Sequence, residues 1–215
     1  SAIITACFKA LTRFYQVDIQ PQILANLILS VETRELGISA GLQDRVAQVY
    51  EHPIYMDFDK DHMDQYGYGI YKPINDKCLP SFYIAYRRNL SEGTEVVHNN
   101  LRARFEIGDP SVLAAMKRWG QITSEFMQAL VIGDFDTMHD LMNENFNLRR
   151  SIIPITSGNI EMVDLARSTG ASAKFTGSGG AIIGTYRSEE MYSELKDIMD
   201  HHEIEVFKPN IVIHP

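Results

Sequence analysis

Cysteine is scarce in this 215-residue chain, which has only Cys7 and Cys78. Two cysteines cannot form the framework of a disulfide-stapled domain, and a pair so far apart lacks the spacing of a zinc site. Both classes of small, cross-linked protein are therefore excluded. Cysteine usage of this kind is typical of a reducing compartment, so we expect a cytoplasmic protein.

Two further absences restrict the partners. No apolar run approaches the roughly 18 residues that a membrane-spanning helix needs, and no basic segment followed by an apolar one marks a secretory signal. Acidic residues outnumber basic ones, and the net charge of −8 argues against general binding to nucleic acid or to acidic membranes. We expect neither as a partner, although a local pocket for a small anion is compatible with this charge.

The remaining composition is that of an ordinary globular protein, with 45% hydrophobic and 22% charged residues and enough length for one large domain or two small ones. The chain opens on Ser1 rather than Met and enters a helical pattern at once. We therefore expect a fragment of a longer protein, one product of a split gene, or a processed product.

Apolar periodicity places the secondary structure. Ser1 is a suitable N-cap for the first helix, Pro21 suits the start of the second, and Gly37 ends it; Ser111 and Asp134 are further predicted caps. The spacing predicts helices over residues 1–15, 21–37, 94–105, 111–132, 134–150, 159–169 and 188–201, and a loop that continues as helix over 38–48. Alternation predicts strands over 54–58, 79–86, 181–186 and 203–207, and a short run ending at Thr176. Residues 59–77 are interpreted as a connection.

The order of these elements is two helices, strands, several helices, and then strand, turn, strand, helix and strand. Such an order predicts an α+β fold in which helices pack on an antiparallel sheet. The domain boundary is predicted near Ser91, which would divide the chain into domains of residues 1–90 and 91–215.

A glycine-rich turn follows the short run, with Gly177, Ser178, Gly179 and Gly180 in succession. Glycine permits positive φ, and consecutive N–H groups in such a turn can form a concave nest for anions. A tight β-turn between two strands explains the same residues. The turn has neither the Gly-Lys-Ser/Thr of a Walker loop nor the spacing of a dinucleotide-binding fingerprint.

Acidic residues stand on both sides of the exit from the second helix, at Glu32 and Asp44. Asp44 followed by Arg45 is compatible with a cap and a surface ion pair of little energetic consequence. The functional alternative is that a carboxylate at a helix start beside a guanidinium stays ionised and accepts a proton from a substrate hydroxyl. Arg149 and Arg150, at a helix end, similarly fit either pairing with the helix dipole or a clamp on an anion.

Three segments, in this order, resemble motifs of the GHMP kinases, the superfamily of galactokinase, homoserine kinase and mevalonate kinase. The opening Ser-Ala-Ile-Ile is similar to the tail of the phosphate-binding Gly-Leu-x-x-Ser-Ser-Ala motif. Residues 36–44, Leu-Gly-Ile-Ser-Ala-Gly-Leu-Gln-Asp, resemble the segment that ends in the catalytic aspartate, and residues 170–180 resemble the C-terminal glycine-rich motif. Residues 41–50, 55–58, 147–150 and 174–181 extend the resemblance along essentially the whole chain, to the glucuronokinase branch of the superfamily.

The resemblance implies a kinase fold with a ferredoxin-like C-terminal domain and an ATP- and Mg²⁺-dependent transfer of phosphate to the anomeric hydroxyl of D-glucuronate. It implies these roles for residues of this chain: Asp44 as the base, Gln43 and Arg45 as contacts to the sugar acid, Ser1 and Glu32 as Mg²⁺ ligands, and Ser1, Gly177, Ser178, Gly179 and Gly180 at the ATP phosphates.

The sequence departs from the family in one respect, because the glycines that should precede Ser1 and cradle the ATP phosphates are absent. We expect them in a preceding segment or in a separate chain, so that the chain alone would be an incomplete kinase. Two alternatives remain open: a kinase for a heptose phosphate or a neutral sugar, and a truncated, non-catalytic module that binds a sugar or a partner protein.

Overall fold

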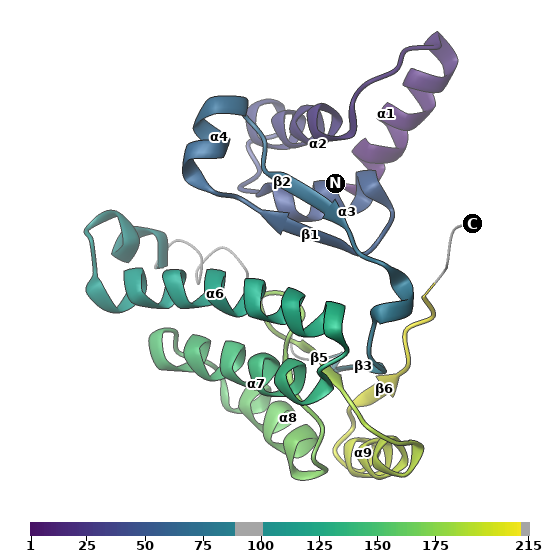
Figure 1. Cartoon of the computed structure of the whole chain (residues 1–215), viewed down its shortest axis with the longest axis vertical. Coiled ribbons are helices and arrows are strands. Elements are labelled where there is room, and N and C mark those ends of the chain that lie inside the picture. The colour runs from purple at the N-terminus through teal and green to yellow at the C-terminus, as the bar shows by residue number, and fades with distance from the viewer. Residues whose placement is uncertain (89–100, 212–215) are drawn as a thin grey trace. The chain divides into compact units, whose positions relative to one another are not determined.

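The computed structural model describes residues 1–88 and 101–211, which form two compact units, Ser1–Lys77 and Cys78–Pro215 (Figure 1). The domain boundary predicted near Ser91 lies outside the described residues. Strand β3 (Phe82–Tyr86), expected in the first domain, pairs with strands β5 (Ala181–Thr185) and β6 (Glu205–Phe207) and so belongs to the sheet of the second unit. The predicted α+β class is confirmed in both units.

The first unit begins with three helices, α1 (Ala2–Tyr15), α2 (Pro21–Ser30) and α3 (Leu42–Tyr50). Helix α2 runs on into η1 (Val31–Glu35), a π-helical segment in which the N–H of Leu36 donates to the carbonyl of Val31 at 3.1 Å. Gly37, at φ +66°, then ends the helical run, as predicted. The buried side chains of this unit gather between α2 and α3, where Ile28 and Val46 are fully buried.

A small hairpin completes the first unit. Strands β1 (Ile54–Asp57) and β2 (Ile70–Pro73) pair antiparallel, with Ile54 opposite Pro73. The interpretation of residues 59–77 as a plain connection is wrong, because it contains β2, helix α4 (Lys60–Tyr66) and most of η2 (Asp76–Cys78), a turn of 3₁₀-helix. The side chain of Asp59 caps α4 by accepting from the N–H of His62 at 2.9 Å.

The second unit is built on a four-stranded antiparallel sheet in the order β4-β5-β3-β6. Its other strands are β4 (Lys174–Phe175), β5 (Ala181–Thr185) and β6 (Glu205–Phe207). Ala85 of the central strand β3 stands opposite Ile182 on one side and Val206 on the other. Strand, helices, two strands, helix and strand follow one another along the chain, which is the ferredoxin-like succession expected of this part.

Four long helices accompany this sheet: α6 (Pro110–Ile132), α7 (Phe135–Ile152), α8 (Ser157–Ser168) and α9 (Glu189–His201). Helices α6 and α7 pack side by side (Figure 1). Asp134 caps α7 as predicted, whereas the predicted cap Ser111 is wrong: Asp109 caps α6, because Pro110 occupies the first helical position. The helix predicted over 94–105 begins outside the described residues, and residues 101–106 are helical.

The core of the second unit lies between the sheet and helices α7, α8 and α9. Tyr83, Phe146, Ile182, Leu195 and Met199 are all fully buried there. Alternate residues of β3 are buried, so one face of the sheet meets the helices.

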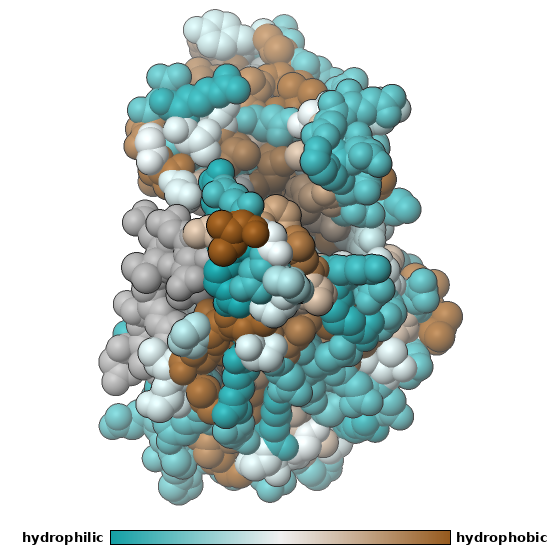
Figure 2. Space-filling view, turned by 90° about the vertical axis from the view of Figure 1, so that its left-hand side faces the viewer, coloured by the Kyte–Doolittle hydropathy of each residue, from teal (hydrophilic) through white to brown (hydrophobic). Residues whose placement is uncertain are grey.

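Outside this core, apolar side chains also lie among the polar ones at the molecular surface (Figure 2). In helix α1, for example, Ile3 and Phe14 are about four-fifths exposed, at 80% and 78%. Within the described residues, no helix combines the length and the apolar character that crossing a membrane would require.

Candidate functional site

The start of α3 presents a carboxylate on top of a buried ion pair. Arg45 is 7% exposed and donates through Nε and Nη2 to Oε2 of Glu32, which is 3% exposed. Its remaining nitrogen, Nη1, donates to the carbonyl of Gly41 at 3.0 Å and lies 3.4 Å from Oδ2 of Asp44. The side chain of Asp44 is 73% exposed, so one of its oxygens lies near Arg45 while most of its surface is open to solvent.

Two local features produce this arrangement. The π-helical turn η1 places Glu32 inward, and π-turns within helices are frequent at functional sites. Gly41 has an extended backbone and precedes α3, so that Asp44 falls in its first turn, where the helix dipole favours a negative charge.

Ser1 joins the same cluster through its main chain. Its nitrogen lies 2.7 Å from Oε1 of Glu32, and its hydroxyl accepts from Nε2 of Gln48 at 2.7 Å. Gln48 accepts in turn from the hydroxyl of Thr5 at 3.0 Å. The structure therefore brings together Ser1, Glu32, Asp44 and Arg45, and Gln43 is exposed beside them. The roles that the resemblance implies for these residues stay predictions.

The electrostatics of Glu32 follow from these contacts. Burial opposes ionisation of its carboxyl, but hydrogen bonds from the Ser1 nitrogen and from Arg45 outweigh burial and lower its pKa below the ordinary value of 4.5. Glu32 is therefore a carboxylate at neutral pH, and it neutralises Arg45.

The predicted Mg²⁺ ligands can be tested against this geometry. Mg²⁺ needs octahedral oxygen ligands, whereas both oxygens of Glu32 already face hydrogen-bond donors and a guanidinium stands where a cation would come. Among residues 1–88 and 101–211, no three His, Cys, Asp or Glu side chains are grouped so as to hold a metal ion. Glu32 and Ser1, as arranged, do not fit Mg²⁺, and their role as metal ligands stays a prediction.

The glycine-rich turn lies in the second unit, where it joins β4 to β5. Phe175 pairs with Ile182 at the base of the hairpin, and the N–H of Thr176 donates to the carbonyl of Ala181 at 3.2 Å. Gly179 and Gly180 have φ of +152° and +76°, a region that favours glycine. Gly177 is exposed at the tip, whereas Gly180 is buried.

Two side chains that the sequence did not single out for this turn hold its shape. Arg149, from the last turn of α7, donates to the carbonyls of Gly177 at 2.8 Å and Ser178 at 3.0 Å, and its guanidinium lies 5.0 Å from the ring centre of Phe175. The buried side chain of Asn159 accepts from the N–H of Gly180 at 2.8 Å. No spacing rule links Arg149 to Gly177, 28 positions away, or Asn159 to Gly180, 21 positions away, so the only sequence signal was an arginine at a helix end.

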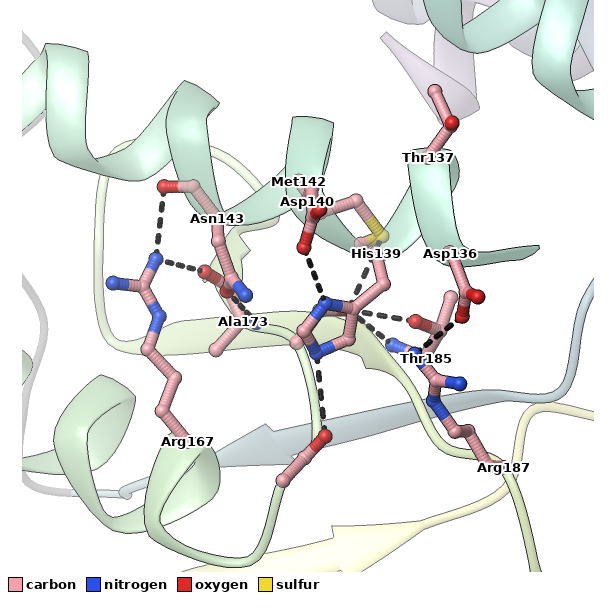
Figure 3. Close-up of polar contacts among 12 residues, drawn as sticks. Asp136, Thr137, His139, Asp140, Met142, Asn143, Arg167, Ala173, Thr185 and Arg187 are labelled. Carbon is pink, nitrogen blue, oxygen red and sulfur yellow. Dashed lines mark hydrogen bonds and ion pairs between the residues drawn. The ribbon is translucent and has the colours of Figure 1, made fainter. Parts of the chain in front are cut away.

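Polar contacts also tie the strand before the turn to α7 (Figure 3). Oδ1 of Asn143 accepts from the N–H of Ala173 at 3.0 Å, and Arg167 donates to the carbonyls of both residues. Deeper in the core, the hydroxyls of Ser172 and Thr185 are 2.7 Å apart. The chain entering the turn is thus fixed by hydrogen bonds as well as by apolar packing.

Comparison with known proteins shows which proteins the chain resembles. The model of the family described as GHMP kinases C terminal matches residues 126–201. The chain is 44% identical over 188 residues to Glucuronokinase 1 of Arabidopsis thaliana. The aligned region covers 85% of this chain and 51% of that protein. It is 24% identical over 187 residues to the D-glycero-alpha-D-manno-heptose 7-phosphate kinase of Campylobacter jejuni, covering 83% of this chain and 53% of that protein. The chain thus spans about half the length of the curated relatives it matches.

Among solved structures, L. major mevalonate kinase in complex with R-mevalonate has a TM-score of 0.73 at 20% identity, over 97% of this chain and 65% of that one. At this identity the likeness establishes a common fold. The predicted resemblance to the GHMP kinases is confirmed. Residues 126–201 in the second unit match the family of GHMP kinases C terminal, and the chain as a whole is similar to the glucuronokinases and shares the fold of mevalonate kinase.

Proposed function

We propose that this chain belongs to an ATP-dependent sugar kinase that transfers the γ-phosphoryl group of ATP to the anomeric hydroxyl of D-glucuronate, giving the 1-phosphate and ADP. Support for the substrate comes from the 44% identity to the Arabidopsis glucuronokinase. Support for the chemistry comes above all from one observation, the exposed carboxylate of Asp44 standing on the buried Glu32–Arg45 pair.

Phosphoryl transfer needs mainly correct positioning and charge stabilisation, with one group to take the proton of the attacking hydroxyl. In the proposed reaction Asp44 accepts that proton while the sugar oxygen bonds to the γ-phosphorus and the bond from that phosphorus to the ADP oxygen breaks. Arg45, expected to contact the sugar acid, is buried and faces Glu32, Gly41 and Asp44 with its donor nitrogens, so we assign it instead to orienting Asp44. Gln43 is the exposed neighbour that we assign to the sugar.

We assign the glycine-rich turn of Gly177 to Gly180 to binding a phosphate group, because backbone amides in such a turn favour anions. The sequence contains no second glycine-rich phosphate loop of the family, so we propose that a segment preceding Ser1, or a separate chain, supplies it. ATP enters this reaction as the complex with Mg²⁺.

The test of Asp44 uses the complete gene product that contains this chain. Asp44→Asn keeps the shape of the side chain and removes its basicity, so kcat should fall by about 10²–10⁴-fold, the usual effect of a positioned base. Asp61→Asn, an exposed aspartate of α4, is the matched control and should leave kcat unchanged. If the Asp44 variant retains full activity, the proposed base is wrong.

A panel of sugars distinguishes the substrates. We expect ADP release with D-glucuronate, and phosphorus NMR should identify a product phosphorylated at the anomeric oxygen. Faster turnover of a heptose phosphate would favour the second candidate, which the 24% identity to the Campylobacter enzyme supports. If no sugar in the panel releases ADP, a non-catalytic binding module becomes the better description.

A further inference from the structure

Helix α1, at the edge of the first unit, turns a polar face towards its neighbours (Figure 1). Thr5 is the one buried residue of this helix, all of which the structure describes. The hydroxyl of Thr5 donates to Oε1 of Gln48 in α3 at 3.0 Å. Nζ of Lys9 donates to the carbonyl of Gln48 at 3.2 Å and pairs with Glu51. Because Thr5 and Lys9 are four positions apart, polar contacts on one side of α1 fix the helix on α3.

The opposite side of α1 is apolar. Its exposed side chains recur at intervals of three and four positions, which is the spacing of one helix face. We call this face the α1 stripe, and it consists of Ile3, Ala6, Cys7, Ala10, Leu11 and Phe14. Ile3 and Phe14 are about four-fifths exposed, and Leu11 is 53% exposed. A helix of a globular protein normally turns its apolar face to the core, so α1 has the reverse orientation.

The charges of α1 restrict what can cover the stripe. Lys9 and Arg13 are the charged residues of this helix, and Lys9 is paired on the inner side with Glu51. Binding to an acidic membrane or to nucleic acid would need several basic residues beside the stripe. A contiguous apolar face without such residues is typical of a contact with another apolar protein surface.

A protein segment of sufficient length is expected in the gene product. The chain spans about half the length of its curated relatives and 65% of the mevalonate kinase that shares its fold. The nucleotide loop was assigned above to a segment preceding Ser1. Such a segment would join the chain at the first turn of α1, two residues before Ile3, so the covalent link would hold it at high effective concentration beside the stripe.

We propose that the segment preceding Ser1 packs an apolar, uncharged face on the α1 stripe, so that α1 lies buried between this segment and α3. The proposal rests on the proposed function for the existence of that segment. It gives the segment a structural role besides supplying the nucleotide loop, and it places the thiol of Cys7 within the contact.

Cys7 allows a test that needs no activity, because its thiol is exposed in the 215-residue chain. Maleimide labelling, with each labelled cysteine identified by peptide mass mapping, compares this chain with the complete gene product. Cys7 should react about tenfold more slowly or less in the complete protein, since labelling then requires the contact to open. A cysteine introduced by Lys196→Cys, at an exposed position of α9, is the control and should react equally in both proteins.

Three results of the labelling would overturn the proposal. The first is equal reactivity of Cys7 in the two proteins. The second is a gene product with no segment before Ser1. The third is protection of Cys7 in the 215-residue chain that increases with protein concentration, because the occupant would then be a second copy of this chain.

Phe14→Lys tests the energetics of the contact in the same two proteins. In the 215-residue chain Phe14 is largely exposed and lies in the last turn of α1, where a cation is favourable, so the Tm should stay within about 1 °C of wild type. In the complete gene product the lysine would be buried in an apolar contact, and the Tm should fall by about 5 °C or more. Phe14→Leu keeps the apolar character and is the matched control, which should melt close to wild type in both proteins.

An equal shift of the Tm by Phe14→Lys in both proteins would overturn the proposal. Failure of the proposed function is a separate outcome. If the wild-type gene product turns over no sugar, the kinase assignment fails, whereas labelling and melting need no turnover and still decide whether the preceding segment covers α1.

Discussion

Glu32 and Arg45 are each less than a tenth exposed, and each is the other's counter-ion. Removing two charges from water is costly, and their attraction compensates only while both are present. Loss of one partner therefore leaves an uncompensated buried charge, which lowers the free energy of unfolding by more than the intact pair raises it. The exposed Asp44 depends on this pair for its support.

Glu32→Gln should lower the free energy of unfolding by about 3 kcal/mol near pH 7, the usual result of breaking a buried pair. The folded pKa of Glu32 is depressed, so its contribution is complete above the ordinary value of 4.5 and is lost as the pH falls through the folded pKa. The difference between wild type and variant in urea unfolding should therefore shrink in acid. Glu35→Gln, an exposed glutamate of η1, is the control; a difference independent of pH would contradict the ion pair.

Position 184 requires glycine, because neighbouring atoms leave no room for a Cβ. A Cβ there would lie 1.7 Å from the carbonyl oxygen of Ser172 and 2.5 Å from Cε1 of Tyr83. Gly184→Ala should therefore lose about 3 kcal/mol of stability or more through overpacking. Gly120→Ala, in the middle of α6 with nothing within 4 Å of the added carbon, should gain about 0.5–1 kcal/mol. Thermal unfolding of both variants measures the contrast, and a stable Gly184→Ala protein would refute the packing described.

At the scale of single residues, the sequence indicated the cluster of Glu32, Asp44 and Arg45 but not the contacts between Arg149 and the glycine-rich turn. Glu32, Asp44 and Arg45 are near in sequence, so their proximity followed from helix ends and a family motif. Arg149 and the glycine-rich turn are brought together only by the packing of α7 on the hairpin, which no local pattern encodes.

At the scale of elements, long segments with strong apolar periodicity were predictable, and short ones were not. Helices α6, α7, α8 and α9 follow their predicted ranges within a few residues. Helix α4 and strand β2 are short and half-buried at most, and their Tyr- and Gly-rich sequence carries no clear period. The cap of α6 was misplaced by two residues because Pro110 determines which residue precedes the helix.

The start of α6 should be sensitive to acid. Hydrogen bonds from Ser111 and from Arg104 hold the pKa of Asp109 well below its ordinary 3.8, so its contribution is complete above that value and is lost as the pH falls further. Amide exchange at Ser111 and Val112, corrected for the intrinsic rate, should quicken in acid. Asp109→Asn keeps a capping oxygen and should abolish this pH dependence, whereas Asp197→Asn on α9 should preserve it. An unchanged acid response in Asp109→Asn would contradict the assignment.

At the scale of the whole molecule, the chain divides into two compact units and spans about half of its curated relatives. The first unit contains the proposed base, and the second contains the glycine-rich turn. The reaction that we propose needs both features together with a nucleotide loop that this sequence does not contain. Activity therefore belongs to the complete gene product in our proposal.

Calorimetry with Mg-ATP tests whether nucleotide binding needs the complete gene product. The 215-residue chain should give little heat, because the amides that form most of the phosphate cradle are expected to precede Ser1. The complete gene product should give a clear binding isotherm under the same conditions. Equal heats for the two proteins would mean that the glycine-rich turn suffices for nucleotide binding.

A π-turn houses one residue more than an α-turn, and η1 contains such a turn directly behind Glu32. The helical run ends at Gly37, so the extra residue of this turn lengthens the connection that leads from Glu32 to Arg45. Related chains one residue shorter at this turn must close that connection with one residue fewer in order to keep the ion pair.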